Sequence, residues 1–101
     1  MSALSPILRA IEGERLMFRC PGCRSAHMVR YGQGPGPRWA WNGNASQPTF
    51  DPSILVTWRD PDGELPATIC HSFVRDGQIQ FLSDCTHALA GQTVPLPEWP
   101  E

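Results

Sequence analysis

The stretch from Ile69 to Gly91, ICHSFVRDGQIQFLSDCTHALAG, decides the fold more than any other part of the chain. At its centre an Asp76-Gly77 pair separates two runs in which apolar and polar residues alternate. Both central residues of a two-residue hairpin turn need positive φ, which Asp and Gly tolerate, so the pattern predicts a β-hairpin. The stretch also contains two of the four cysteines and two of the three histidines. We therefore expect this hairpin to carry part of a functional site.

The register of the hairpin predicts which side chains share a face. With the Asp-Gly pair in the turn, residues 70–75 lie opposite residues 78–83. Side chains alternate between the two faces of a strand, so Cys70 and Cys85 fall on one face at the open end and His71 falls on the other. A single bulge would exchange Cys70 for His71.

Composition restricts the fold and the partners. A chain of 101 residues with eleven prolines and nine glycines predicts one domain, residues 1–101, built from short strands and many turns. The net charge of −2 and the absence of a basic run argue against binding to a nucleic-acid backbone. No leader peptide or long apolar run is visible, so we expect a cytoplasmic protein. In that compartment cysteines are better interpreted as metal ligands than as disulfides.

Local signals predict further elements on both sides of the hairpin. Two of them are short helical stretches. Ser5-Pro6 and Asp84 are residues that typically begin a helix, and Gly13 and Gly91 are residues that typically end one. The others are strands, including SILVTW, which we expect to be buried. The expected elements are a helix over Ser5–Ile11, a hairpin over Leu16–Tyr31 with CPGC at its tip, strands over Arg38–Trp41, Ser53–Trp58 and Thr93–Pro97, and a helical turn over Cys85–Ala90.

Four thiols are enough for a closed tetrahedral metal site. Structural Zn²⁺ sites commonly take a pair of ligands from each of two hairpins, which predicts Zn²⁺ bound by Cys20, Cys23, Cys70 and Cys85. His71 and His87 are alternative ligands, so four thiolates and three thiolates plus one imidazole both remain open. CPGC also resembles a redox motif, but such motifs normally open a helix, and here the following residues favour a strand.

Two other groups of residues could form a functional site. His27, His71 and His87 could form an open metal site for hydrolysis, with Asp84 orienting one ring. Trp39 and Trp41 could stack on single-stranded nucleic acid, although the net charge disfavours this. We expect Trp58 to fill the core.

Several unusual sequence motifs in the chain show a resemblance to a known family. FRCPGC, WAWNGN followed by QPTFDPSI, and CHSFVRDGQIQFLSDCTHALAGQTVPLP occur in this order between Phe18 and Pro97. They resemble a family of small tailed-phage and prophage proteins, some of which carry an ammonia monooxygenase label. The resemblance implies a phage-encoded accessory protein in the cytoplasm of a bacterial host cell, with cysteine and histidine ligands for a metal.

These observations combine into one prediction of fold and function. The fold is mainly β, a small zinc-stapled sandwich or partly open barrel of short hairpins with one or two helical turns. The function is that of a non-enzymatic binding or interaction module, with a protein as its partner. A metal-dependent hydrolase using the three histidines is the competing hypothesis.

Overall fold

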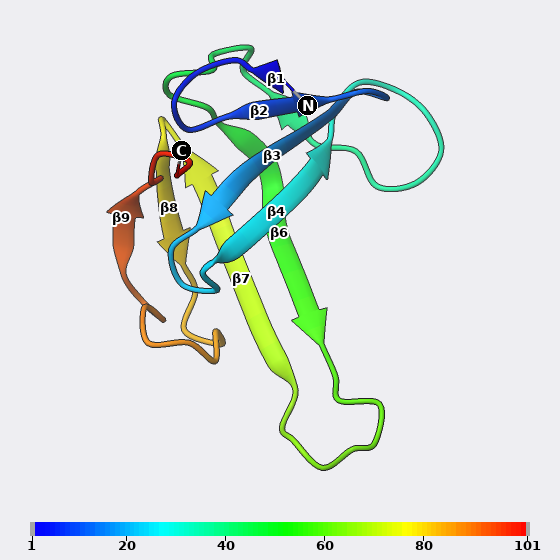
Figure 1. The fold of residues 1–101 in the computed structure, drawn as a ribbon, viewed down its shortest axis with the longest axis vertical. Helices are drawn as coiled ribbons and strands as arrows, with labels where there is room; N and C mark the ends of the chain where they lie inside the picture. Colours follow the sequence, from blue (N-terminus) through cyan, green and yellow to red (C-terminus); the bar gives the residue numbers. More distant parts are fainter. Residues whose placement is uncertain (1, 101) are drawn as a thin grey trace.

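The chain forms two antiparallel sheets that pack against each other (Figure 1). The computed structural model describes residues 2–100. One sheet has the order β1-β2-β3-β4 and the other the order β5-β6-β7-β8-β9. The strands are β1 Ser2–Ala3, β2 Arg9–Ile11, β3 Arg15–Cys20, β4 Ser25–Arg30, β5 Ala40–Trp41, β6 Phe50–Trp58, β7 Thr68–Arg75, β8 Gln78–Phe81 and β9 Thr93–Pro95.

The hairpin of β7 and β8 confirms the expected register. Asp76 and Gly77 form the turn with φ of 51° and 78°, and Val74 pairs with Ile79. The hairpin of β3 and β4 is also confirmed, with Cys20 paired to Ser25 at the end that carries CPGC. Its tip turns because Arg24 adopts a φ of 57° and its N–H bonds to the Cys20 carbonyl at 2.8 Å.

The core lies between the two sheets, where the inward residues of each strand meet. Burial alternates along β3 and β7, as expected for strands with one covered face. Phe18 of the first sheet stacks on Phe50 of the second, with ring centroids 6.1 Å apart. The buried apolar residues include Leu8, Leu16, Phe18, Val29, Phe50, Ile54, Val74, Ile79, Phe81 and Leu96.

Two expectations about helices are wrong for residues 2–100, which contain no helix. The Ser5 hydroxyl does accept bonds from the N–H groups of Ile7 and Leu8, as an N-cap would. However, the capped turn stops there, because Arg9–Ile11 pairs with β3 instead of continuing a helix. Within residues 85–90, only residues 88–90 lie in a turn, which continues to residue 91. None of the described residues forms a helix that could cross a membrane.

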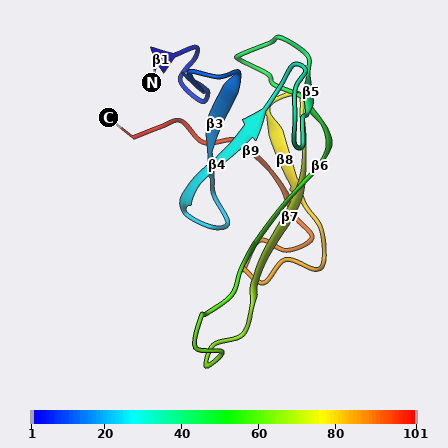
Figure 2. The same ribbon diagram turned by 90° about the vertical axis from the view of Figure 1, so that its right-hand side faces the viewer.

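The SILVTW strand exists, but the prediction that it is buried is wrong beyond Ile54. The hairpin of β6 and β7 extends past the first sheet, so its far end has no covering layer (Figures 1 and 2). Leu55 is 57 % exposed, and Trp58, which we expected in the core, is 53 % exposed.

Candidate catalytic and metal sites

A bulge in β6 sets the direction of the Ser53 side chain. Phe50 pairs with Val74 and Ile54 with Ser72, so three residues of β6 lie opposite Phe73 alone. Bulges re-aim side chains and are common beside active sites. Here Ser53 Oγ lies 3.1 Å from Nε2 of His71 on the neighbouring strand. The Trp39 indole N–H donates to the Ser53 carbonyl at 3.2 Å and helps to fix the backbone at this point.

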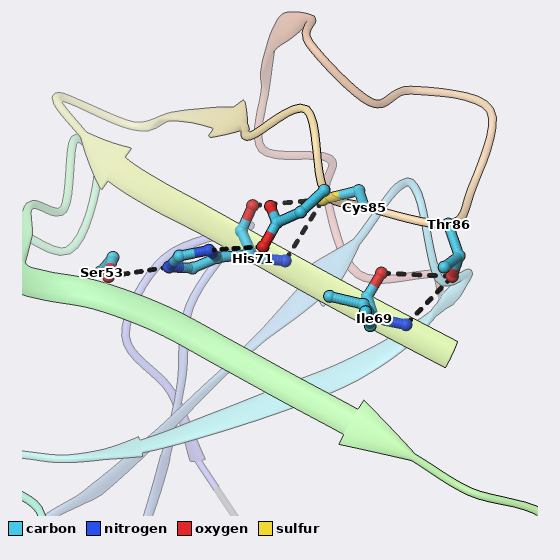
Figure 3. A network of polar contacts seen from close by, with 6 residues as sticks. Ser53, Ile69, His71, Cys85 and Thr86 are labelled. Carbon is cyan, nitrogen blue, oxygen red and sulfur yellow. Dashed lines mark hydrogen bonds and ion pairs between the residues drawn. The ribbon is translucent and has the colours of Figure 1, made fainter. Parts of the chain in front are cut away.

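The opposite ring nitrogen of His71 faces a carboxylate. Nδ1 lies 3.1 Å from Oδ2 of Asp84, while Nε2 faces Ser53 (Figure 3). A serine, a histidine and an aspartate therefore lie in hydrogen-bonded sequence, with the imidazole between the hydroxyl and the carboxylate. This is the arrangement that activates a serine nucleophile, and it is recognised by geometry and not by order in the chain. The His71 and Asp84 side chains are 26 % and 52 % exposed, so the group is open to a ligand.

The segment that carries Asp84 is tied to β7 by two side chains (Figure 3). The Cys85 sulfur accepts from the His71 N–H and donates to the His71 carbonyl, both at 3.2 Å. The Thr86 hydroxyl accepts from the Ile69 N–H at 3.0 Å. Because β8 ends at Phe81, these side chains occupy the edge of β7 where a strand would otherwise pair. The position of Asp84 relative to His71 depends on them.

On the opposite face of β7, a second cluster could hold a metal ion. The ligand atoms of Cys20, Cys23, Cys70 and His87 all lie within 4.8 Å of one another. Tetrahedral Zn²⁺ would require sulfur atoms about 3.8 Å apart and a sulfur–nitrogen separation of about 3.6 Å. The Cys20 and Cys70 sulfurs are 3.7 Å apart, and the Cys70 sulfur lies 3.5 Å from His87 Nε2. The spacing of these donors fits a tetrahedral ion.

The CPGC turn leaves room for the histidine of this cluster. A Cβ atom on Gly22 would collide with the His87 ring, so only glycine lets the turn approach it. The ring also packs edge-on against Phe81, with centroids 4.4 Å apart. The Leu89 N–H faces His87 Nδ1 at 3.2 Å. A metal on Nε2 would place the ring proton on Nδ1, so this last contact must lengthen when a metal binds.

Without a metal, the cluster favours one thiolate and two thiols. The hydrogen bond from Cys70 lowers the pKa of Cys20 to about 4, with smaller help from His27 and the Cys23 N–H. The same interaction with Cys20, followed by burial, raises the pKa of Cys70 far above its usual range. Burial raises the pKa of Cys23 to about 11, and the charge on Cys20 adds to this effect. None of the four cysteines, all of which lie within residues 2–100, is in a disulfide.

The structure separates the residues that the sequence analysis grouped together. Cys85, expected as a fourth thiolate, bonds to the backbone of His71 and is not in the cluster. The reason is that β8 ends at Phe81, so the alternation of side chains along a strand no longer determines the direction of the Cys85 side chain. His71 lies in the Ser53 site, so within residues 2–100 the three histidines do not form a metal-binding group. His27 is buried and packs edge-on against Phe18.

Sequence reasoning missed Ser53 entirely. It assigned Asp84 to orient a histidine, which is its relation to His71 here. Ser53 follows a proline at the start of an apolar run and matches no nucleophile motif. The only usable signal was the pairing of Ser53–Trp58 with the hairpin, which would have placed a serine near His71.

Comparison with known families gives a match over most of the chain. The model of a family described as bacterial ubiquitination-like system serine protease (BubE) matches residues 4–82, which is more than half of the chain. The matched range includes Ser53 and His71 and ends just before Asp84. No curated protein and no solved structure matches the chain.

Proposed function

Because the chain belongs to the BubE family, whose description is that of a serine protease of a bacterial ubiquitination-like system, we propose that it is itself a serine protease. The observation that carries the proposal is the hydrogen-bonded line from Ser53 through His71 to Asp84. The proposed substrate is a protein of that system, so the proposed partner is a protein. The family description and the geometry both point to a serine nucleophile.

In the proposed mechanism His71 acts first as base and then as acid in each half-reaction. Ser53 Oγ attacks the scissile carbonyl while His71 Nε2 takes the hydroxyl proton, and the carbonyl electrons move onto oxygen. When the intermediate collapses, the C–N bond breaks and His71 gives its proton to the leaving amine. Water then repeats the sequence on the acyl-serine. Asp84 holds the ring with Nε2 toward Ser53 and stabilises the imidazolium that forms.

The metal cluster has a different task in this proposal. Cys20, Cys23, Cys70 and His87 would hold Zn²⁺, the ion that three thiolates and one imidazole select. Four protein ligands leave no open position for substrate or water, so the metal would stabilise the fold without taking part in catalysis. It would join the CPGC turn, β7 and the segment that follows Asp84.

Proteolysis of a protein from the same ubiquitination-like system tests the proposal. The wild type should cleave it, and Ser53→Ala should lose nearly all activity while keeping its metal and its unfolding midpoint. Ser72→Ala is the matched control, because the Ser72 hydroxyl is buried on the other face of β7 without a hydrogen-bond partner among residues 2–100. It should remain active and no less stable.

The same experiment separates the proposal from the hypotheses made from the sequence. An interaction module would bind the substrate without cleaving it, and Ser53→Ala would then behave like the wild type. A metal-dependent hydrolase would lose activity at once when a chelator removes the metal from folded protein, and Ser53→Ala would keep its activity. Either result would reject the serine mechanism.

A further inference from the structure

The strand that carries Ser53 has an unpaired edge. The partner of β6 on that side, β5, pairs only with Phe50 and Asp51. Within residues 2–100, no backbone group from outside the sheet bonds to residues 54–58. Exposed edges of this kind are templates for another strand. This edge begins at Ser53.

The hydrogen bonds of β7 show which groups of β6 face the open edge. The N–H and carbonyl of His71 bond to Cys85 and Leu82, and those of Ile69 bond to Thr86, all on the side away from β6. Their partners in β6 are Leu55 and Thr57. In an antiparallel ladder such positions alternate with bonded ones, so Leu55 and Thr57 direct their N–H and carbonyl groups outward.

Both faces beside this edge are apolar and accessible. Leu55, which is 57 % exposed, lies directly across from His71 on the face of the triad. Val56 and Trp58 point to the other face, where they line a groove of about 510 Å³ that also contacts the CPGC turn and His87. Residues 53–58 carry no charge. A polypeptide along this edge would therefore find backbone partners with apolar surface on both sides.

We propose that this edge of β6 is the substrate-binding strand of the protease, occupied by an extended segment of the substrate. The inference rests on the proposed function of Ser53. The residues that precede the scissile bond run antiparallel to β6, and the scissile carbonyl lies at Ser53. Substrate residues opposite Leu55 and Thr57 bond to their outward N–H and carbonyl groups, as in strand addition to other sheet edges. The residue opposite Val56 places an apolar side chain toward the groove.

Substrate length provides the test. Acetylated peptides of one to five residues, each ending in a fluorogenic coumarin amide, are compared with matching peptidyl phosphonates that inactivate a reactive serine. We expect kcat/KM and the inactivation rate to rise as the peptide grows long enough to reach Leu55 and then Thr57. Each added pair of backbone bonds should contribute about ten- to 100-fold. Methylating the amide nitrogen opposite Leu55 should remove that gain without changing the protein.

Variants of Leu55 separate its backbone from its side chain. Leu55→Pro removes the outward N–H at a position where an edge strand accepts proline, and Leu55→Ala keeps that N–H. We expect Leu55→Pro to lose most of the gain in kcat/KM that wild type shows when the peptide becomes long enough to reach Leu55. The small fluorophosphonate does not extend along the edge, so its reaction reports whether Ser53 is still reactive in the variant. Leu55→Ala should retain the dependence. Metal content and circular dichroism check that the variants fold.

The outcomes distinguish a failure of the serine mechanism from a failure of the substrate-strand inference. If the fluorophosphonate does not label wild-type protein, the serine mechanism itself fails. If labelling occurs but peptides of all lengths react equally, or not at all, the substrate-strand inference is overturned. Sedimentation of wild type and Leu55→Pro adds one further test. A dimer that Leu55→Pro dissociates would show that a second copy of the chain occupies this edge, which would also overturn the inference.

Discussion

Thr86→Val tests whether the segment after β8 positions the catalytic carboxylate. The valine removes the hydroxyl that accepts the Ile69 N–H at 3.0 Å. The 3.3 Å bond from the hydroxyl to the Ile69 carbonyl is also lost, but that carbonyl keeps the Thr86 N–H at 2.9 Å. The variant therefore loses one good hydrogen bond at an exposed site, which should lower the free energy of unfolding by about 1 kcal/mol.

That loss of stability is too small to affect activity by itself. A domain with an unfolding free energy of at least 5 kcal/mol stays above about 99 % folded after losing 1 kcal/mol. A shift of Asp84 by a fraction of an ångström to an ångström, however, can lower kcat about ten- to 100-fold. We therefore expect kcat to fall by that factor, because kcat depends on the alignment of the triad. KM can change as well, because Thr86 lines the groove beside Val56.

The assay combines urea unfolding, metal content and steady-state proteolysis. Thr86→Ser is the matched control, because it keeps the hydroxyl and should restore kcat to near the wild-type value. The reasoning is refuted if Thr86→Val loses about 1 kcal/mol of stability while kcat stays unchanged. It is also refuted if Thr86→Ser is as impaired as Thr86→Val.

Three further predictions concern the triad and the metal cluster. Asp84→Asn should keep the fold and metal but lower kcat by about 10²- to 10⁴-fold, because the amide cannot stabilise the imidazolium; an unchanged kcat would remove Asp84 from the mechanism. Gly22→Ala should displace the His87 ring and weaken Zn²⁺ binding by at least about 10- to 100-fold in competition with a chelator, whereas wild-type affinity would show that His87 is not a ligand. Zinc uptake near pH 7 should release about two protons. The pKa of Cys20 is lowered to about 4, so its thiolate is already formed. The pKa of Cys23 is raised to about 11 and that of Cys70 is raised further, so both thiols must lose a proton when the metal binds. The apparent Zn²⁺ affinity should then rise with pH by about 100-fold per unit around neutrality, and a pH-independent affinity would contradict this assignment.

The sequence predicted the parts of the fold that local chemistry specifies. An Asp-Gly pair between alternating runs is enough to define the turn at Asp76-Gly77 and the register of β7 with β8. CPGC between two apolar runs likewise predicted the tip of the β3–β4 hairpin. Both features depend on neighbours in the chain, which is why they could be recognised without a structure.

The sites could be predicted only in part, because they depend on contacts between distant segments. Asp84 was assigned to orient a histidine, and it does face His71, because it follows the β7–β8 hairpin by only a few residues. Ser53 was missed because its position depends on a bulge in β6 and on the pairing of that strand with β7. Cys85 was assigned to the metal because strand alternation was extended past Phe81, where β8 ends.

The central claim is that Ser53 is a nucleophile activated by His71 and Asp84. Mass spectrometry of the protein after reaction with a fluorophosphonate tests it most directly. We predict one adduct per chain, located on Ser53, that forms in wild type and in Ser72→Ala and is lost or greatly slowed in His71→Ala. No adduct on folded, metal-loaded protein, or an adduct on another serine that forms equally fast in His71→Ala, would contradict the claim.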